Sequence, residues 1–146
     1  MILRHDYQSI DLHYVAGNLH VSGQISGDYA KSAKQSTINY GDRFLYARES
    51  PDVRYVKEGD ARLTNGEARI DVDPIFLECI EPHTPDSRWY ITLTPYGKAI
   101  LYVDEIGDDY FIVKDYNDNA NGIEFTWSLS ATRKDYANIN LMEAID

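Results

Sequence analysis

The sequence predicts a mostly β protein: an antiparallel β-sandwich or small barrel head with one short helix, preceded by a thin β stem. Residues 123–132 alternate apolar and polar side chains, which is the period of a half-buried strand. An Asn-Gly pair at 65–66 is a strong hairpin signal. Short alternating runs also occur before residue 26. The 146 residues, 43% of them hydrophobic, suffice for one domain with a short appendage.

Residues 1–35 are predicted to form a stem for trimerisation and a polar linker. Their apolar runs are about four residues long and are separated by glycines, so one copy is too narrow to bury its own apolar face. We therefore expect a homotrimer in which three copies cover one another. A flexible arm or a single hairpin remains the alternative. The predicted trimer contacts are Leu12, Leu19, Val21 and Ile25.

Residues 36–146 are predicted to form the β head. A first strand over 43–50 ends before Pro51, because proline forces the preceding residue into an extended or turn geometry. Asn65-Gly66 predicts a hairpin between the apolar runs 61–63 and 68–72. Asp73 is placed to cap a helix of two turns, with Pro74 at its first position.

The rest of the head is predicted to be strands. Segments 88–95 and 99–106 predict a second hairpin around the turn 95–98, and a further strand follows at 110–114. The strand at 123–132 presents an apolar face to a core and a Thr/Ser face to water, which is typical of one sheet of a sandwich or small barrel. The last segment, 136–146, is either a frayed tail or a short helix that packs back.

The charge balance excludes some partners. With 14 Lys+Arg against 24 Asp+Glu, the net charge of −10 repels nucleic acid and anionic membranes. The longest apolar runs are far shorter than the ~20 residues that span a bilayer. The first residues lack the apolar region of an export signal, so we expect any extracellular role to need release by lysis or by another route.

The sequence favours a protein without catalytic residues. The single cysteine, Cys79, is predicted to be a small buried side chain on the apolar face of the helix rather than a nucleophile. We expect neither a cofactor nor a metal, although a stem histidine repeated around a threefold axis is an alternative. Paired acids also leave open a glycan hydrolase. The candidate acids are Asp71, Asp73, Glu105, Asp108 and Asp109.

The twelve tyrosines suit contact with a sugar or a protein, because tyrosine offers a flat face and a hydroxyl at its tip. Some of them lie in or beside predicted turns, where side chains reach solvent. The candidate receptor contacts are Tyr96, Tyr102, Tyr116 and the turn residue Asn119.

The order of several segments resembles the C-terminal domain of phage and prophage minor structural or tail-appendage proteins of Gram-positive bacteria. The segments that carry the resemblance span residues 17 to about 136 and read NLHVSGQISG, YGDRFLYARESPDV, GDARLTNGEARIDVDPIFLECI, WYITLTPYGKAILYVDEI, DDYFIVKD and IEFTWSLSATRKDY. Compared with that family the chain is short, without a long shaft, an upstream enzymatic domain or an attachment module, so we expect either the distal fragment of a longer protein or a small accessory protein.

This resemblance implies a tail-fibre or receptor-binding protein of the virion, extracellular after lysis. Its head would bind a host-surface polysaccharide or protein, or would close the trimer. The implied partners are further copies of the chain and other tail proteins. The resemblance implies no catalytic residues. A secreted adhesion domain unrelated to a virus is the remaining alternative.

Overall fold

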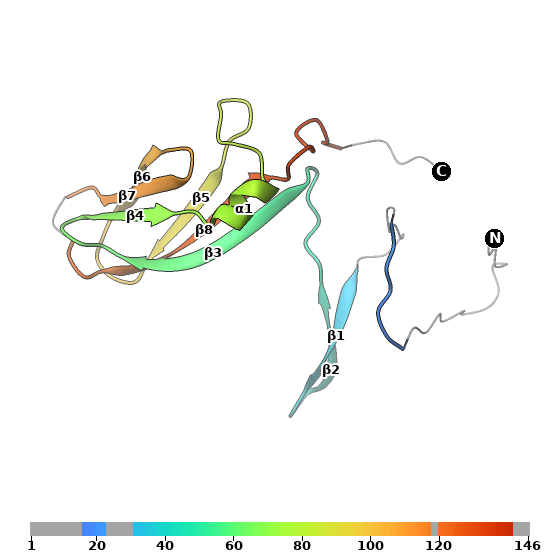
Figure 1. The fold of residues 1–146 in the computed structure, drawn as a ribbon. Helices are drawn as coiled ribbons and strands as arrows, with labels where there is room; N and C mark the ends of the chain where they lie inside the picture. The colour runs from blue at the N-terminus through green and yellow to red at the C-terminus, as the bar shows by residue number, and fades with distance from the viewer. Residues whose placement is uncertain (1–15, 23–30, 118–119, 142–146) are drawn as a thin grey trace. The chain divides into compact units, whose positions relative to one another are not determined.

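The computed structural model describes residues 16–22, 31–117 and 120–141. It confirms the mostly β class, with 50% strand, 5% helix and one short helix (Figure 1). The strands form three antiparallel sheets that do not close into a barrel. Within the described residues no helix is both long and apolar enough to cross a membrane.

The chain divides into two compact units, Met1–Arg48 and Glu49–Asp146. This division follows Arg48, whereas the sequence placed the boundary after residue 35. The reason is a hairpin: strand β1 (Ser32–Thr37) pairs with β2 (Gly41–Tyr46) across that predicted boundary. Of the predicted stem contacts, Leu19 and Val21 are exposed in this structure, and Leu12 and Ile25 lie outside the described residues.

The hairpin of the first unit is stabilised by the backbone pairing of its two strands and by hydrogen bonds at its turn. The Thr37 hydroxyl donates to the carbonyl of Gly41 at 2.7 Å and accepts from the amide of Tyr40 at 3.1 Å. Gly41 has a φ of 68°, a left-handed conformation that glycine adopts without steric cost. Lys34 and Asp42 form an ion pair of 2.7 Å across the strands.

The second unit consists of two three-stranded sheets of order β3-β8-β5 and β4-β7-β6. Their elements are β3 (Arg54–Arg62), β4 (Glu67–Asp71), α1 (Pro74–Cys79), β5 (Tyr90–Pro95), β6 (Leu101–Ile106), β7 (Tyr110–Asp115) and β8 (Glu124–Thr132).

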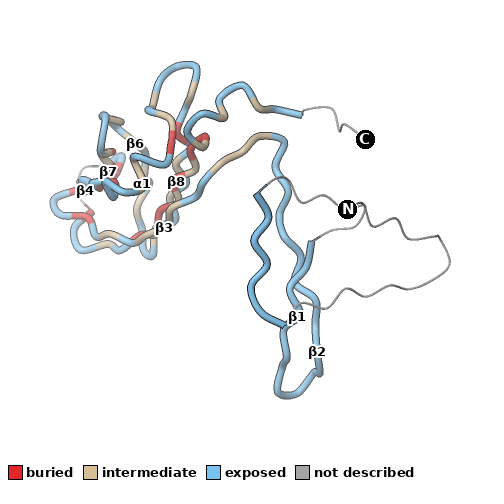
Figure 2. The backbone as a smooth tube through the Cα atoms, turned by 45° about the vertical axis from the view of Figure 1, so that its right-hand side comes forward, coloured by how far each residue is buried: buried red, intermediate tan, exposed pale blue. Residues whose placement is uncertain are grey.

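The core lies between the inner faces of these two sheets, as the buried segments in Figure 2 indicate. Strand β8 confirms the predicted alternation by burying Phe125, Trp127, Leu129 and Ala131. Trp127 meets Phe111 of the opposite sheet edge to face, with ring centroids 5.5 Å apart. This contact joins the two layers as in a sandwich.

The Asn65-Gly66 turn forms as predicted, but its hairpin does not extend. Both residues have positive φ, 52° and 80°, and Thr64 and Glu67 exchange backbone hydrogen bonds of 2.8 and 3.2 Å. Beyond that single turn, β3 pairs with β8 while β4 pairs with β7. The turn therefore carries the chain from one sheet to the other.

The second predicted hairpin, around residues 95–98, is wrong. Strand β5 pairs with β8 and β6 pairs with β7, so the two strands belong to different sheets. The turn is held by Asp115, which is buried and accepts from the amides of Ile100 at 2.9 Å and Ala120 at 3.3 Å. This carboxylate fixes the crossover between the layers.

The structure of the helix confirms the predicted N-cap and shows that the predicted burial of its cysteine is wrong. Asp73 accepts hydrogen bonds from the amides of Ile75 at 2.8 Å and Phe76 at 3.4 Å. Cys79, predicted to be buried, is exposed, because Phe76 and Leu77 are the helical side chains that pack on the core.

The described part of the last segment packs back on the second unit, but not as a helix. Asn140 forms a β-bridge with Asp52. The amide of Leu141 donates to the carbonyl of Pro51 at 2.9 Å. The end of the chain that is described is therefore tied to the segment that precedes β3.

Candidate functional site

The candidate site is the outer face of the β3-β8-β5 sheet. Alternate residues of β8 point into the core, which leaves Thr126, Ser128 and Ser130 on the other face. The register sets two rows across the three strands. Each row places a carboxylate of β3, a hydroxyl of β8 and a hydroxyl of β5 side by side. The rows are Glu58, Ser128 and Thr92, and Asp60, Thr126 and Thr94.

These two rows line an open depression of about 490 Å³. Its walls and floor are Glu58, Gly59, Asp60, Thr92, Thr94, Thr126, Trp127 and Ser128. Glu58 and Asp60 are exposed, and within the described residues neither forms an ion pair. The depression thus offers four hydroxyls and two carboxylates whose hydrogen-bonding capacity is open to a ligand.

Gly59 allows the floor to form. A Cβ atom at this position would lie 2.5 Å from the indole ring of Trp127. That ring is held in the core against Phe111, so it has little room to move. The glycine lets β3 pass close to the ring without distorting the rows on the other face.

A tyrosine stands at each end of the two rows on β5. Tyr90 pairs with Ser130 in the ladder and is exposed. Tyr96 follows the end of β5, where its amide donates to the carbonyl of Glu124 at 2.7 Å, and it is exposed as well. Six strand positions separate the two, about 20 Å at the rise of an extended chain. The face is long enough for an extended ligand.

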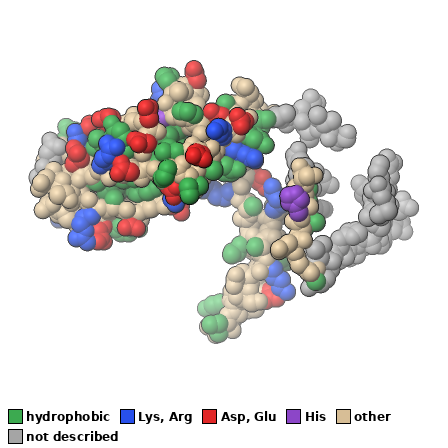
Figure 3. Space-filling model, in the orientation of Figure 1, with side chains coloured by type: hydrophobic (Ala, Val, Ile, Leu, Met, Phe, Trp, Pro, Cys, Tyr) green, Lys and Arg blue, Asp and Glu red, His purple; other side chains and the backbone are tan. Residues whose placement is uncertain are grey.

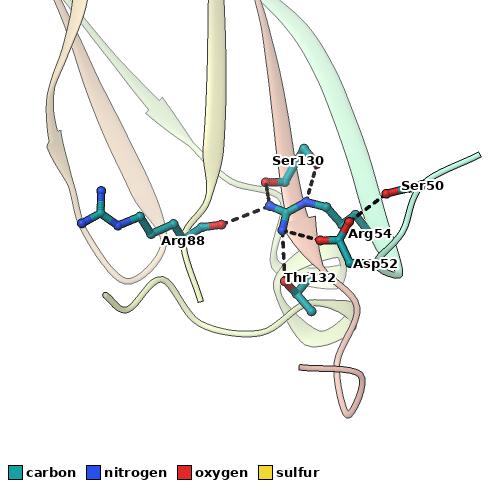
Figure 4. Close-up of polar contacts among 6 residues, drawn as sticks. All are labelled: Ser50, Asp52, Arg54, Arg88, Ser130 and Thr132. Carbon is teal, nitrogen blue, oxygen red and sulfur yellow. Dashed lines mark hydrogen bonds and ion pairs between the residues drawn. The ribbon is translucent and has the colours of Figure 1, made fainter. Parts of the chain in front are cut away.

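Arg54 anchors the end of the rows at which Tyr90 lies. Figure 4 shows the polar contacts of Arg54 with Asp52, Arg88, Ser130 and Thr132. Its Nε donates to the Ser130 hydroxyl at 2.9 Å, and its Nη2 donates to the carbonyls of Ser130 at 2.8 Å and Arg88 at 3.0 Å. Its Nη1 bonds to Asp52 and to the hydroxyl of Thr132, each at 3.2 Å. The guanidinium carbon lies 4.1 Å from the centroid of the Tyr90 ring. This cation–π contact holds the ring beyond the row of Glu58, Ser128 and Thr92.

Asp52 completes this anchor. The Ser50 hydroxyl donates to its carboxylate at 2.8 Å, and this bond, followed by the contacts with Arg54, lowers the pKa of Asp52 below its usual value. The carboxylate therefore stays ionised and keeps its pair with Arg54 at neutral pH.

The predicted contact tyrosines do not converge on one site. Tyr96 follows the end of β5, two residues beyond Thr94 of the candidate site, whereas Tyr102 lies on β6 of the other sheet. Tyr116 follows β7, with its amide bonded to the carbonyl of Ile100 at 2.8 Å. Asn119 lies outside the described residues. Sequence reasoning missed Arg54, Glu58, Asp60 and Tyr90; the alternation within 54–62 and 90–95 was their only signal, and it needed the strand register to become a site.

The outer face of the β4-β7-β6 sheet is already occupied by its own polar contacts. Arg69 pairs with Asp71 at 2.7 Å and lies 3.5 Å above the ring of Tyr110. The Tyr110 hydroxyl donates to Glu105, and this bond is the main cause of its raised pKa. Lys114 bonds to Asp104 at 2.7 Å, which raises the lysine pKa. This face therefore has fewer open groups for a ligand than the candidate site.

Four of the five acids considered for a hydrolase, all except Asp108, have structural partners. Asp71 pairs with Arg69, and Asp73 caps α1 while lying 3.9 Å from Lys57. Glu105 accepts from Tyr110, and Asp109 lies 3.9 Å from Arg69. Across the described ranges, no group of three or more His, Cys, Asp and Glu side chains is arranged to hold a metal ion. Of the histidines predicted in the stem, only His20 is described, and it is exposed.

Comparison with protein-family models, with curated proteins and with solved structures gave no match to this chain.

Proposed function

We propose that this protein is a non-enzymatic binding protein whose outer β3-β8-β5 face attaches to carbohydrate on a host cell surface. The observation that carries the proposal is the depression with its two rows of hydroxyls and carboxylates between Tyr90 and Tyr96. Exposed polar groups on a sheet are suited to recognition, since the strands fix their backbone positions in advance and so lower the entropy cost of binding.

The chemistry of the face matches a polyhydroxylated ligand. Carboxylates only accept hydrogen bonds, and the Thr and Ser hydroxyls both donate and accept, which complements the hydroxyls of a sugar. The tyrosine faces supply flat apolar surfaces on which sugar rings stack. Because Glu58 and Asp60 carry negative charge, the face favours a neutral or amino-bearing polysaccharide over a phosphate-rich one.

The setting that we propose is a phage tail appendage of tail-fibre or receptor-binding type, trimeric and carried on the virion. Its support is the order of motifs from residue 17 to about 136, together with a β-sandwich-like head. Further copies of the chain and other tail proteins would be its partners, and it would act outside the cell after lysis. A secreted adhesion domain would use the same binding face.

Binding of purified host-wall polysaccharide, followed by calorimetry or by amide chemical shifts, tests this function. The combined change Glu58→Gln and Asp60→Asn, or the change Tyr96→Ser, is expected to weaken binding about 30-fold, as loss of a hot-spot contact does. Tyr102→Ser on the other sheet is the control and should bind as the wild type does.

Two outcomes would count against the proposal. Equal loss of binding in Tyr102→Ser and Tyr96→Ser would remove the assignment to this face. Release of new reducing ends from the polysaccharide, abolished by Asp71→Asn or Asp73→Asn, would favour the hydrolase instead.

A further inference from the structure

The β1–β2 hairpin exposes apolar side chains that belong to no buried cluster of the described residues. Every residue of both strands is exposed, on both faces of the two-stranded sheet. A two-stranded hairpin alone is at best marginally stable in water. Figure 3 shows hydrophobic side chains at the surface of this hairpin. Those that are 60% to 100% exposed are Ile38, Tyr40, Phe44, Leu45 and Tyr46.

The apolar surface of this hairpin is large enough to contribute to a protein interface. Phe44 and Tyr46 lie on one face of β2, because successive strand residues point to opposite faces. Large aromatic side chains bury roughly 150–250 Å² each, so the exposed parts of Tyr40, Phe44 and Tyr46 offer on the order of 300–500 Å². That is about half of the roughly 800 Å² that a standard interface buries on each partner. A shallow depression of about 350 Å³ also lies on the hairpin, lined by Lys31, Ser32, Ala33, Leu45, Tyr46 and Ala47.

The charges of the two units indicate which partner the apolar surface of the hairpin would contact. Residues 31–48 carry four basic side chains and one acid, Asp42. Residues 49–146 carry nine basic and twenty acidic side chains. A hairpin facing an identical hairpin would bring like charges together, whereas the acidic unit of another copy offers the opposite charge.

We infer that the β1–β2 hairpin is a self-association surface that docks on the 49–146 unit of a second copy of this chain. The inference rests on the oligomeric assembly in the proposed function and assigns its contact to residues 38–46, which the sequence had placed in the head. Such a contact is heterologous, because two different surfaces meet. Repeated around an axis, a heterologous contact closes into a ring such as a trimer.

Sedimentation equilibrium of the full chain tests this inference. The wild type should have a mass at least twice the 16.7 kDa of one chain. The double change Phe44→Ser and Tyr46→Ser should weaken association about 30-fold. Raising the salt from about 0.05 to 0.5 M should weaken the wild-type association as well, because the charges become screened.

The matched control is Tyr90→Ser with Tyr96→Ser, since Tyr46 and Tyr96 are both 66% exposed. This control should keep the mass of the wild-type assembly and lose polysaccharide binding. The hairpin variant should still bind polysaccharide at the β3-β8-β5 face of each copy. Failure of the self-association surface is then distinguishable from failure of the binding function. Both tryptophans, Trp89 and Trp127, lie in the second unit, so their fluorescence shows whether that unit remains folded in each variant.

A mixing experiment separates the two ways in which copies could meet. The Phe44→Ser, Tyr46→Ser variant keeps its acidic unit, so a tagged form should capture the wild type through the wild-type hairpin. If the tagged variant did not capture the wild type although the wild type still self-associates, the hairpins would be pairing with each other. That result would overturn the inference. A wild type that stays monomeric, or a hairpin variant of unchanged mass, would overturn it too.

Discussion

Arg54 shows why one residue type is needed at the end of the candidate site. Its guanidinium reaches two side-chain hydroxyls, two carbonyls and a carboxylate, and at the same time lies over an aromatic ring. Only a planar group with five donors makes such a set of contacts. The anchor connects β3, β8 and the chain that enters β5, so it fixes the edge of the binding face as well as the fold.

The change Arg54→Lys should therefore destabilise the second unit by about 1–3 kcal/mol, because lysine cannot satisfy the same acceptors. The Arg54 side chain is only 12% exposed, which leaves those acceptors poorly hydrated once the guanidinium is gone. Chemical denaturation followed by tryptophan fluorescence measures the effect.

Arg62→Lys is the control, since Arg62 is 62% exposed and pairs with the exposed Glu124. We expect less than about 0.5 kcal/mol from it, as for other surface pairs. Equal effects of the two changes would contradict the role given to Arg54.

Among the elements, α1 depends most on a single side chain. It has only six residues, and a helix of that length does not persist alone. Asp73 binds two of its free amides, and Phe76 and Leu77 pack against the core. Asp73→Ala should cost about 1 kcal/mol of stability in a denaturant titration, because an N-cap is lost.

Asp73→Asn separates the cap from the charge. Asparagine caps as well as aspartate but cannot pair with Lys57, 3.9 Å away. The Asn variant should stay within a few tenths of a kcal/mol of the wild type. If it were as unstable as the Ala variant, the ion pair rather than the cap would hold the helix.

At the scale of elements, the sequence predicted the features that depend on neighbouring residues of the chain. The alternation of β8 and the cap at Asp73 each depend on neighbouring residues, and both are confirmed. Asn65-Gly66 specified a tight turn but not the partners of the strands beside it. The second hairpin failed for the same reason, since pairing depends on which inner faces meet across the core. The candidate site needed that pairing, because its rows join three strands distant in sequence.

At the scale of the whole molecule, the two units differ in whether their described residues form a buried core. Among the residues that the structure describes, the buried apolar side chains run from Leu63 to Ala131, all within residues 49–146. We therefore expect the fragment 49–146 to fold alone, with tryptophan fluorescence and a thermal midpoint close to those of the full chain.

The fragment 36–146, which follows the boundary expected from the sequence, is the informative comparison. It retains β2 but lacks most of β1, so the ladder of β2 loses its partner while Phe44, Leu45 and Tyr46 stay exposed. An unpaired strand edge with apolar side chains promotes aggregation. Light scattering should show 36–146 associating heterogeneously where 49–146 remains monodisperse. If 49–146 unfolds, or if both fragments behave alike, the division after Arg48 does not describe how the chain folds.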